Sequence, residues 1–296
     1  MARTVLDNVK GEATRIQGLL KDLLAQSSIQ KWYDPNTSNV LWIGGHFSWN
    51  PLGDKGRQIQ ARLLEDYRRF LAVIRVLLSG HPDSTVDKLN DADRQVLEFV
   101  QQNELLFRPD PRPYFESASK GIAGLLELLE GLYGKADDKA TLVPDTNALL
   151  FNPSIEQWRF HEAPQFLLIL TAPVLSELDS LKINHRVEAV REKAERIIRQ
   201  MKEYRRRADC GGGRLADGVD LVSGISQIAT LATEPRMEDS VPWLDPANKD
   251  DRILANVIEV MRTHARSPVW LVTRDINLQN KADYASVPFI EPPYPI

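Results

Sequence analysis

The stretch Thr141-Leu142-Val143-Pro144-Asp145 decides the fold, because a short run of strand-forming residues ends directly on an aspartate. The same arrangement returns at Val269-Trp270-Leu271-Val272-Thr273-Arg274-Asp275, and a third apolar run covers residues 166–171. Apolar runs that alternate with helical segments predict a mainly parallel sheet covered by helices on both faces. Ligands bind such sheets at the carboxyl ends of the strands, so both aspartates are expected at one shared edge.

Further acidic residues belong at this edge. Glu177 lies in the first turns of a helix that Pro173 opens after the third apolar run, and Asp250 and Asp251 open another helix. Crowded carboxylates repel one another and are costly to remove from water, and a divalent cation resolves this conflict. Oxygen-only ligand sets suit Mg²⁺ or Mn²⁺, so the sequence predicts a site for one of these ions.

Taken in order and spacing, four motifs resemble those of the PIN-domain nucleases over about residues 141–290. They are Val-Pro-Asp145-Thr-Asn147-Ala-Leu-Leu, Val-Leu-Ser-Glu177-Leu-Asp, Asp-Asp251-Arg-Ile-Leu and Leu-Val-Thr273-Arg-Asp275-Ile-Asn277-Leu. The last motif is similar to the form in eukaryotic mRNA-decay and exosome PIN domains. The resemblance implies a three-layer α/β/α domain that binds one or two Mg²⁺ or Mn²⁺ ions and cleaves RNA, often single-stranded.

Carried over by position, the resemblance gives four acidic residues that would be catalytic and bind metal: Asp145, Glu177, Asp251 and Asp275. Asp251 is favoured over Asp250 as the ligand because Leu254 follows it in the family's usual Asp-x-x-Leu register. Asp250 is then expected to cap the helix or to support the site. The other supporting residues are Asn147, which would shape its loop, the neighbouring hydroxyl of Thr273, and Asn277.

The first part of the chain has the apolar spacing of long helices. It predicts four helices, over about residues 9–24, 59–78, 84–103 and 122–132. A short strand is expected at Val40–Ile43, and the polar segment 134–139 is expected to be a linker. We therefore expect a mostly helical N-terminal domain at 1–138 and a PIN-like domain at 139–296. The N-terminal domain could position substrate, form a homodimer or hold a regulatory protein.

Composition narrows the function. The chain has 296 residues, a formal net charge of −4 and a single cysteine, Cys210. The acidic balance argues against a non-specific nucleic-acid coat protein, and one thiol cannot form an internal disulfide. No apolar run is long enough to cross a bilayer, and the first residues lack the apolar core of a signal peptide. A cytoplasmic protein without a membrane partner is expected.

Positive charge gathers in the helix expected at 187–207. Arg205, Arg206 and Arg207 are expected to grip phosphate, whereas Glu/Arg pairs could equally make the rest of the helix a solvated surface. The stretch 211–249 is longer than in compact PIN domains and is expected to be mostly irregular, with a strand near 219–222. Its Trp243 is a candidate for stacking on bases.

The observations favour a metal-dependent endoribonuclease that acts on single-stranded RNA. One alternative is a DNA or structure-specific nuclease of the same fold. Another is a catalytically silent PIN-like module that binds nucleic acid or protein, although such modules usually lose acidic residues and all four are present here. A haloacid-dehalogenase-type phosphatase is disfavoured because Asn147 stands where that family needs its second acid.

Overall fold

The computed structural model describes residues 4–31, 47–103, 106–134, 139–265 and 267–295. The chain divides into two compact units. One unit contains Val9–Gly131, and the other contains Met1–Asn8 together with Leu132–Ile296. The domain boundary at 138/139 stays a prediction from the linker composition.

Helices make up most of the N-terminal unit, as the sequence predicts. They are α1 (Val5–Leu24), α2 (Asp54–Leu77), α3 (Asp83–Gln101) and α4 (Arg112–Tyr133). Each buries its apolar stripe, and Ile16, Leu63, Phe99 and Ile122 are all 0% exposed. Two short strands, β1 (Ile29–Lys31) and β2 (Phe47–Trp49), pair antiparallel. The strand expected at 40–43 lies outside the described residues.

The C-terminal unit is built on a six-stranded sheet with the order β5-β6-β4-β3-β7-β8. Its strands are β3 (Ala140–Pro144), β4 (Phe166–Thr171), β5 (Val219–Val222), β6 (Ser226–Leu231), β7 (Val269–Val272) and β8 (Phe289–Ile290). All neighbours pair in parallel except β5, which is antiparallel to β6. The prediction of a mainly parallel α/β sheet is therefore confirmed.

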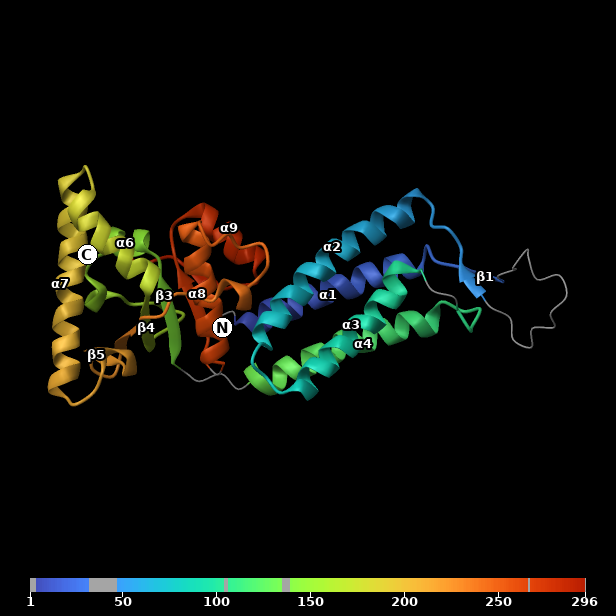
Figure 1. Cartoon of the computed structure of the whole chain (residues 1–296), viewed down its shortest axis with the longest axis horizontal. Helices are drawn as coiled ribbons and strands as arrows, with labels where there is room; N and C mark the ends of the chain where they lie inside the picture. Colours follow the sequence, from blue (N-terminus) through green and yellow to red (C-terminus); the bar gives the residue numbers. More distant parts are fainter. Residues whose placement is uncertain (1–3, 32–46, 104–105, 135–138, 266, 296) are drawn as a thin grey trace. The chain divides into compact units, whose positions relative to one another are not determined.

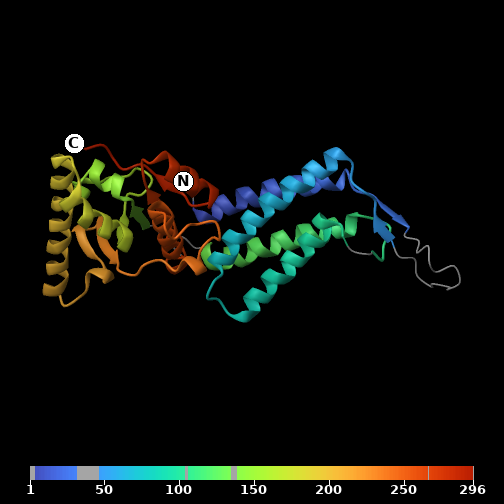
Figure 2. The ribbon, with the colours of Figure 1, turned by 45° about the horizontal axis from the view of Figure 1, so that its top comes forward.

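Helices cover the two faces of this sheet. In both ribbon views, α6 (Ala172–Asn184) and α7 (Glu188–Cys210) lie on one side, and α8 (Lys249–Thr263) lies on the other (Figures 1 and 2). Two short helices, α5 (Thr146–Phe151) and α9 (Ile276–Tyr284), follow β3 and β7 almost directly. Within the described chain, no helix is both long and apolar enough to cross a membrane.

The position of β3 fixes where a ligand would bind. After β3 the chain forms β4, the edge strand β5 and then β6 on one side of β3, and it crosses to the other side of β3 to form β7 and β8. Parallel sheets bind ligands beyond the carboxyl ends of their strands, at the point where the strand order changes direction. That point lies between the ends of β3 and β7, next to Asp145 and Thr273.

The stretch 211–249 differs from the irregular structure that its sequence predicts. Besides the expected β5, it contains β6, which pairs with β4 along six residues. The segment Ser226–Leu231 is only weakly apolar, and its backbone partners come from a strand far away in the sequence. The short helices α5 and α9 are also additional, because six and nine residues are too few for a clear helical period.

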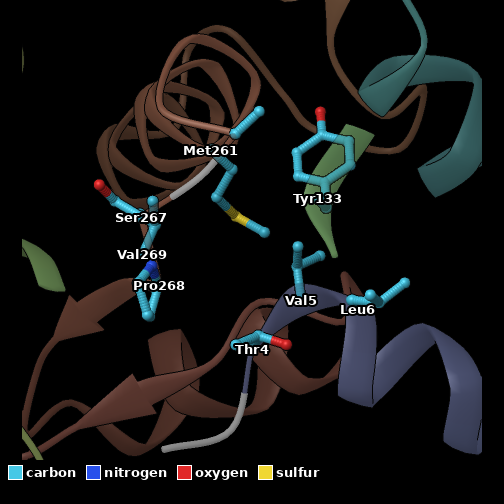
Figure 3. Close-up of a pocket in the computed structure, with 9 residues that line it drawn as sticks. Thr4, Val5, Leu6, Tyr133, Met261, Ser267, Pro268 and Val269 are labelled. Carbon is cyan, nitrogen blue, oxygen red and sulfur yellow. The ribbon is translucent and has the colours of Figure 1, made fainter. Parts of the chain in front are cut away.

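The first turn of α1 belongs to the C-terminal unit. Val5 and Leu6 are each 8% exposed and line a small pocket with Tyr133 and Met261 (Figure 3). The side chain of Asn8 donates a hydrogen bond to the carbonyl of Ser286 at 3.1 Å. Apolar contact and this hydrogen bond therefore hold the beginning of the chain to the C-terminal unit.

Candidate functional site

Asp145 directly follows β3 and caps helix α5. Its Oδ1 accepts a hydrogen bond from the Ala148 backbone N–H at 2.6 Å, and the residue is only 2% exposed. The hydroxyl of Thr273, which directly follows β7, donates to the other carboxylate oxygen. Because β3 and β7 are paired neighbours, the backbone register itself brings these two side chains together.

Asp275, two residues after Thr273, caps helix α9. Its Oδ1 accepts hydrogen bonds from the backbone N–H groups of Asn277 at 2.8 Å and Leu278 at 3.3 Å. Its own N–H donates to Thr273 Oγ at 3.0 Å. The buried Thr273 hydroxyl therefore connects Asp145 to the turn that carries Asp275.

Glu177 lies on α6 and has partners from two other helices. Thr146, in the first turn of α5, donates its hydroxyl hydrogen to Oε2 at 2.8 Å. Lys249, in the first turn of α8, places Nζ 3.3 Å from Oε1. Three helices thus converge on this carboxylate.

Asp251 is the second nearly buried carboxylate, with 5% exposure. Its Oδ2 accepts a hydrogen bond from the Asp245 backbone N–H at 2.9 Å. Its Oδ1 forms an ion pair with Lys281, which reaches over from α9. The ion pair links α8 to the helix that Asp275 caps.

Asn248 caps helix α8, so the expectation that Asp250 serves as the cap is wrong. The Asn248 side chain accepts hydrogen bonds from the N–H groups of Asp250 at 2.9 Å and Asp251 at 3.4 Å. Burial raises the pKa of Asp250, and the nearby charges of Asp275 and other acidic residues raise it further. Asp250 therefore belongs electrostatically to the acidic group.

The carboxylates at this edge act on one another. Burial raises the pKa of Asp145 to about 6, against the hydrogen bonds from Thr273 and Ala148, which lower it. The charges of Asp275 and Asp250 contribute to the same rise. Among the described residues, however, no three His, Cys, Asp or Glu side chains are grouped so that they could hold a metal ion. The acidic residues therefore influence one another's pKa values, but their side chains are not arranged as the ligands of one metal ion.

In its chemistry, the acidic group fits a divalent cation. Its donors are all carboxylate and hydroxyl oxygens, the ligands that Mg²⁺ and Mn²⁺ prefer. Its mutual repulsion is the kind that a cation relieves. In the structure, Lys281 and Lys249 supply positive charge to Asp251 and Glu177 instead.

Three contacts of this edge were missed by the sequence reasoning: those of Thr146, Lys249 and Lys281. Thr146 directly follows Asp145 in the chain, and this position next to an expected metal ligand is the sequence signal that points to it. Lys281 lies a turn and a half beyond Asp275 on a helix that the sequence did not predict. The two expected asparagines, Asn147 and Asn277, have exposed side chains on the first turns of α5 and α9.

The structure does not bring the expected arginine cluster next to the acidic residues. The last turns of α7, which carry Arg205–Arg207, lie beside β5, the strand at the far side of the sheet from β7 (Figure 1). Arg206 forms two hydrogen bonds with Glu203, and Arg207 lies over the ring of Tyr204. Trp243 packs edge to face against Tyr284 of α9, with ring centroids 5.2 Å apart.

The C-terminal unit is thus a helix-covered, mainly parallel α/β sheet with carboxylates beyond its central strands. A family model described as the PIN domain matches residues 142–291, a segment that contains all of these carboxylates. The match spans half of the chain, and the chain belongs to the PIN-domain family, as its motifs predict. Members of this family are generally nucleases that bind nucleic acid. No curated protein matches the chain.

Proposed function

We propose that this protein is a metal-dependent endoribonuclease that hydrolyses phosphodiester bonds of single-stranded RNA at the carboxyl edge of its sheet. One observation supports the proposal most strongly. Carboxylates from several separate segments lie close enough to raise the pKa values of Asp145 and Asp250, at the point where the strand order reverses. They are Asp145, Glu177, Asp250, Asp251 and Asp275. Like charges cost stability when they are gathered and partly buried, so such a group is typical of a functional site.

Asp145, Glu177, Asp251 and Asp275 would hold one or two Mg²⁺ or Mn²⁺ ions. When bound, such ions neutralise the charge of a phosphodiester, lower the pKa of a water molecule and stabilise the leaving oxygen. The protein's own contribution is to fix the oxygens in advance. The Thr273 hydroxyl and one backbone N–H group orient Asp145, two backbone N–H groups orient Asp275, and Thr146 orients Glu177.

A catalytically silent nucleic-acid-binding module is the second candidate, and the two lysines favour it. Lys281 and Lys249 already neutralise two of the carboxylates, as a site that had no need of a metal would require. A DNA or structure-specific nuclease would use the same acidic residues. The N-terminal unit could position substrate or serve as a surface for a homodimer or a regulatory protein.

The test is cleavage of end-labelled single-stranded RNA and DNA of one sequence, with Mn²⁺, Mg²⁺ or EDTA. We expect cutting of the RNA with either metal, slower cutting of the DNA, and no cutting in EDTA. Faster cutting of DNA would replace RNA as the substrate. Cutting that persists in EDTA would contradict the role of the metal, and binding of RNA without any cutting would support the silent module.

A further inference from the structure

A partly exposed aromatic cluster includes a residue that directly precedes Asp275 in the chain. Arg274 stands between Thr273 and Asp275 in the chain, and its guanidinium lies 3.9 Å from the centroid of the Phe151 ring and 5.7 Å from that of Tyr294. The two rings pack edge to face, with centroids 5.6 Å apart and planes at 76°. The end of α5, the turn after β7 and the C-terminal tail meet in this cluster.

The Tyr294 ring faces solvent but its backbone is held in place. The residue is 72% exposed. Its neighbours Pro293 and Pro295 restrict the backbone, because proline fixes φ. The buried Asn152 donates a hydrogen bond to the Pro293 carbonyl at 3.1 Å, and strand β8 ties the preceding residues to β7. A ring presented in this way has little freedom to lose when a flat partner stacks on it.

The cluster is close to the acidic edge along the backbone. Asp145 caps α5 and Phe151 ends it, so the two residues are about 9 Å apart along the helix axis. Arg274 directly precedes Asp275 and is also paired with Glu291, with 3.7 Å between Nε and the carboxylate. A strand of nucleic acid whose phosphate lies at the acidic residues would therefore place a nearby base at these rings.

We propose that Tyr294, Phe151 and Arg274 form a stacking subsite for an unpaired nucleobase. Aromatic faces stack on any base, and an arginine in the same cluster adds attraction for base and phosphate. Bases in a duplex already stack on one another, so the subsite selects single strands. The inference deepens the proposed function and rests on it for the position of the subsite relative to a scissile phosphate.

The experiment measures binding of fluorescently labelled single-stranded RNA to the full-length protein by fluorescence anisotropy. EDTA is present throughout, so that cleavage does not affect the result. Tyr294→Leu removes the aromatic ring and keeps apolar bulk, whereas Tyr294→Phe keeps the ring. Phe107→Leu is the matched control, because Phe107 is 80% exposed but belongs to the other unit. Thermal unfolding of each variant checks that the fold is unchanged.

We expect Tyr294→Leu to weaken RNA binding about fivefold or more, in line with the loss of one base–aromatic stack. Tyr294→Phe and Phe107→Leu should bind like the parent protein. An oligomer with abasic sites should bind the parent and Tyr294→Leu equally. Three results would overturn the subsite. The parent and Tyr294→Leu would bind RNA equally, the substitution would weaken binding of the abasic oligomer as much as that of RNA, or the parent would bind no RNA.

The same variants separate this inference from the proposed function. If RNA binding depends on Tyr294 but the parent cuts no RNA with Mn²⁺, the subsite stands and the nuclease proposal fails. If the parent cuts RNA and Tyr294→Leu has unchanged Kd and KM, the nuclease proposal stands and the subsite fails.

Discussion

Two carboxylates at the sheet edge are almost completely buried, and each has partners that compensate its charge. Asp145 accepts hydrogen bonds from Thr273 and from the Ala148 N–H, whereas Asp251 has a cation, Lys281. A buried carboxylate that loses its only cation is strongly destabilising. Lys281 therefore compensates the charge of Asp251 in the metal-free protein, and it would have to leave Asp251 if that carboxylate bound a metal ion.

The ion pair between Lys281 and Asp251 can be tested by removing the lysine charge. Lys281→Met should lower the free energy of unfolding by about 1–3 kcal/mol without metal, because Asp251 is left without its cation. Mn²⁺ should then raise the Tm of the variant more than that of the parent, because Asp251 is free to bind the ion. Thermal unfolding with and without Mn²⁺ measures both effects.

Lys182→Met is the control for this prediction, because Lys182 pairs on α6 with the exposed Asp179. Its Tm should respond to Mn²⁺ as the parent's does. Equal Mn²⁺ shifts in the parent and in Lys281→Met would show that Lys281 does not compete with a metal ion for Asp251.

Individual elements show what the sequence could and could not predict. Strands β3, β4 and β7 are recognisable because each is a short, almost wholly buried apolar run, and an aspartate follows two of them within three residues. Strand β6 is not, since its pairing with β4 depends on residues that are distant in the sequence. The sequence favours Asp250 as the cap of α8 because it opens the helix beside Asp251, although Asn248 is an equally good capping residue by its chemistry.

The cap gives a prediction at the scale of one helix. Asn248→Ala should lower the free energy of unfolding by about 0.5–2 kcal/mol, because two N–H groups at the start of α8 lose their acceptor. Urea denaturation measures the loss. Asn248→Ser, which can still accept these hydrogen bonds, should recover most of the stability. An equal loss in both variants would show that the cap itself is not responsible.

At the scale of the molecule, the two compact units do not follow the chain in simple order. The first turn of α1 packs with the C-terminal unit, where Val5 lines the same small pocket as Met261 and Tyr133 (Figure 3). Burial in this region raises the pKa of the Tyr133 hydroxyl to about 12. The sequence could not reveal this arrangement, because the contact joins residues from opposite ends of the chain.

The contact predicts that the beginning of the chain stabilises the C-terminal unit. Val5→Asn should lower the free energy of unfolding by about 1–3 kcal/mol, because it brings an amide into an apolar site. Chemical denaturation followed by tryptophan fluorescence measures the change. Thr14→Ala, on the exposed side of the same helix, should have a much smaller effect. Equal stability of Val5→Asn and the parent would contradict the packing of this turn.

The nuclease site at the carboxyl edge of the sheet is tested by two substitutions that remove one carboxylate each. Asp145→Asn alters the buried acid at the end of β3, and Asp179→Asn alters an exposed acid two residues beyond Glu177. Cleavage of labelled single-stranded RNA is measured with Mn²⁺, and thermal unfolding is followed in parallel. We expect Asp145→Asn to fold and to cut at background level, while Asp179→Asn cuts like the parent. Full activity in Asp145→Asn would contradict the assignment of the site.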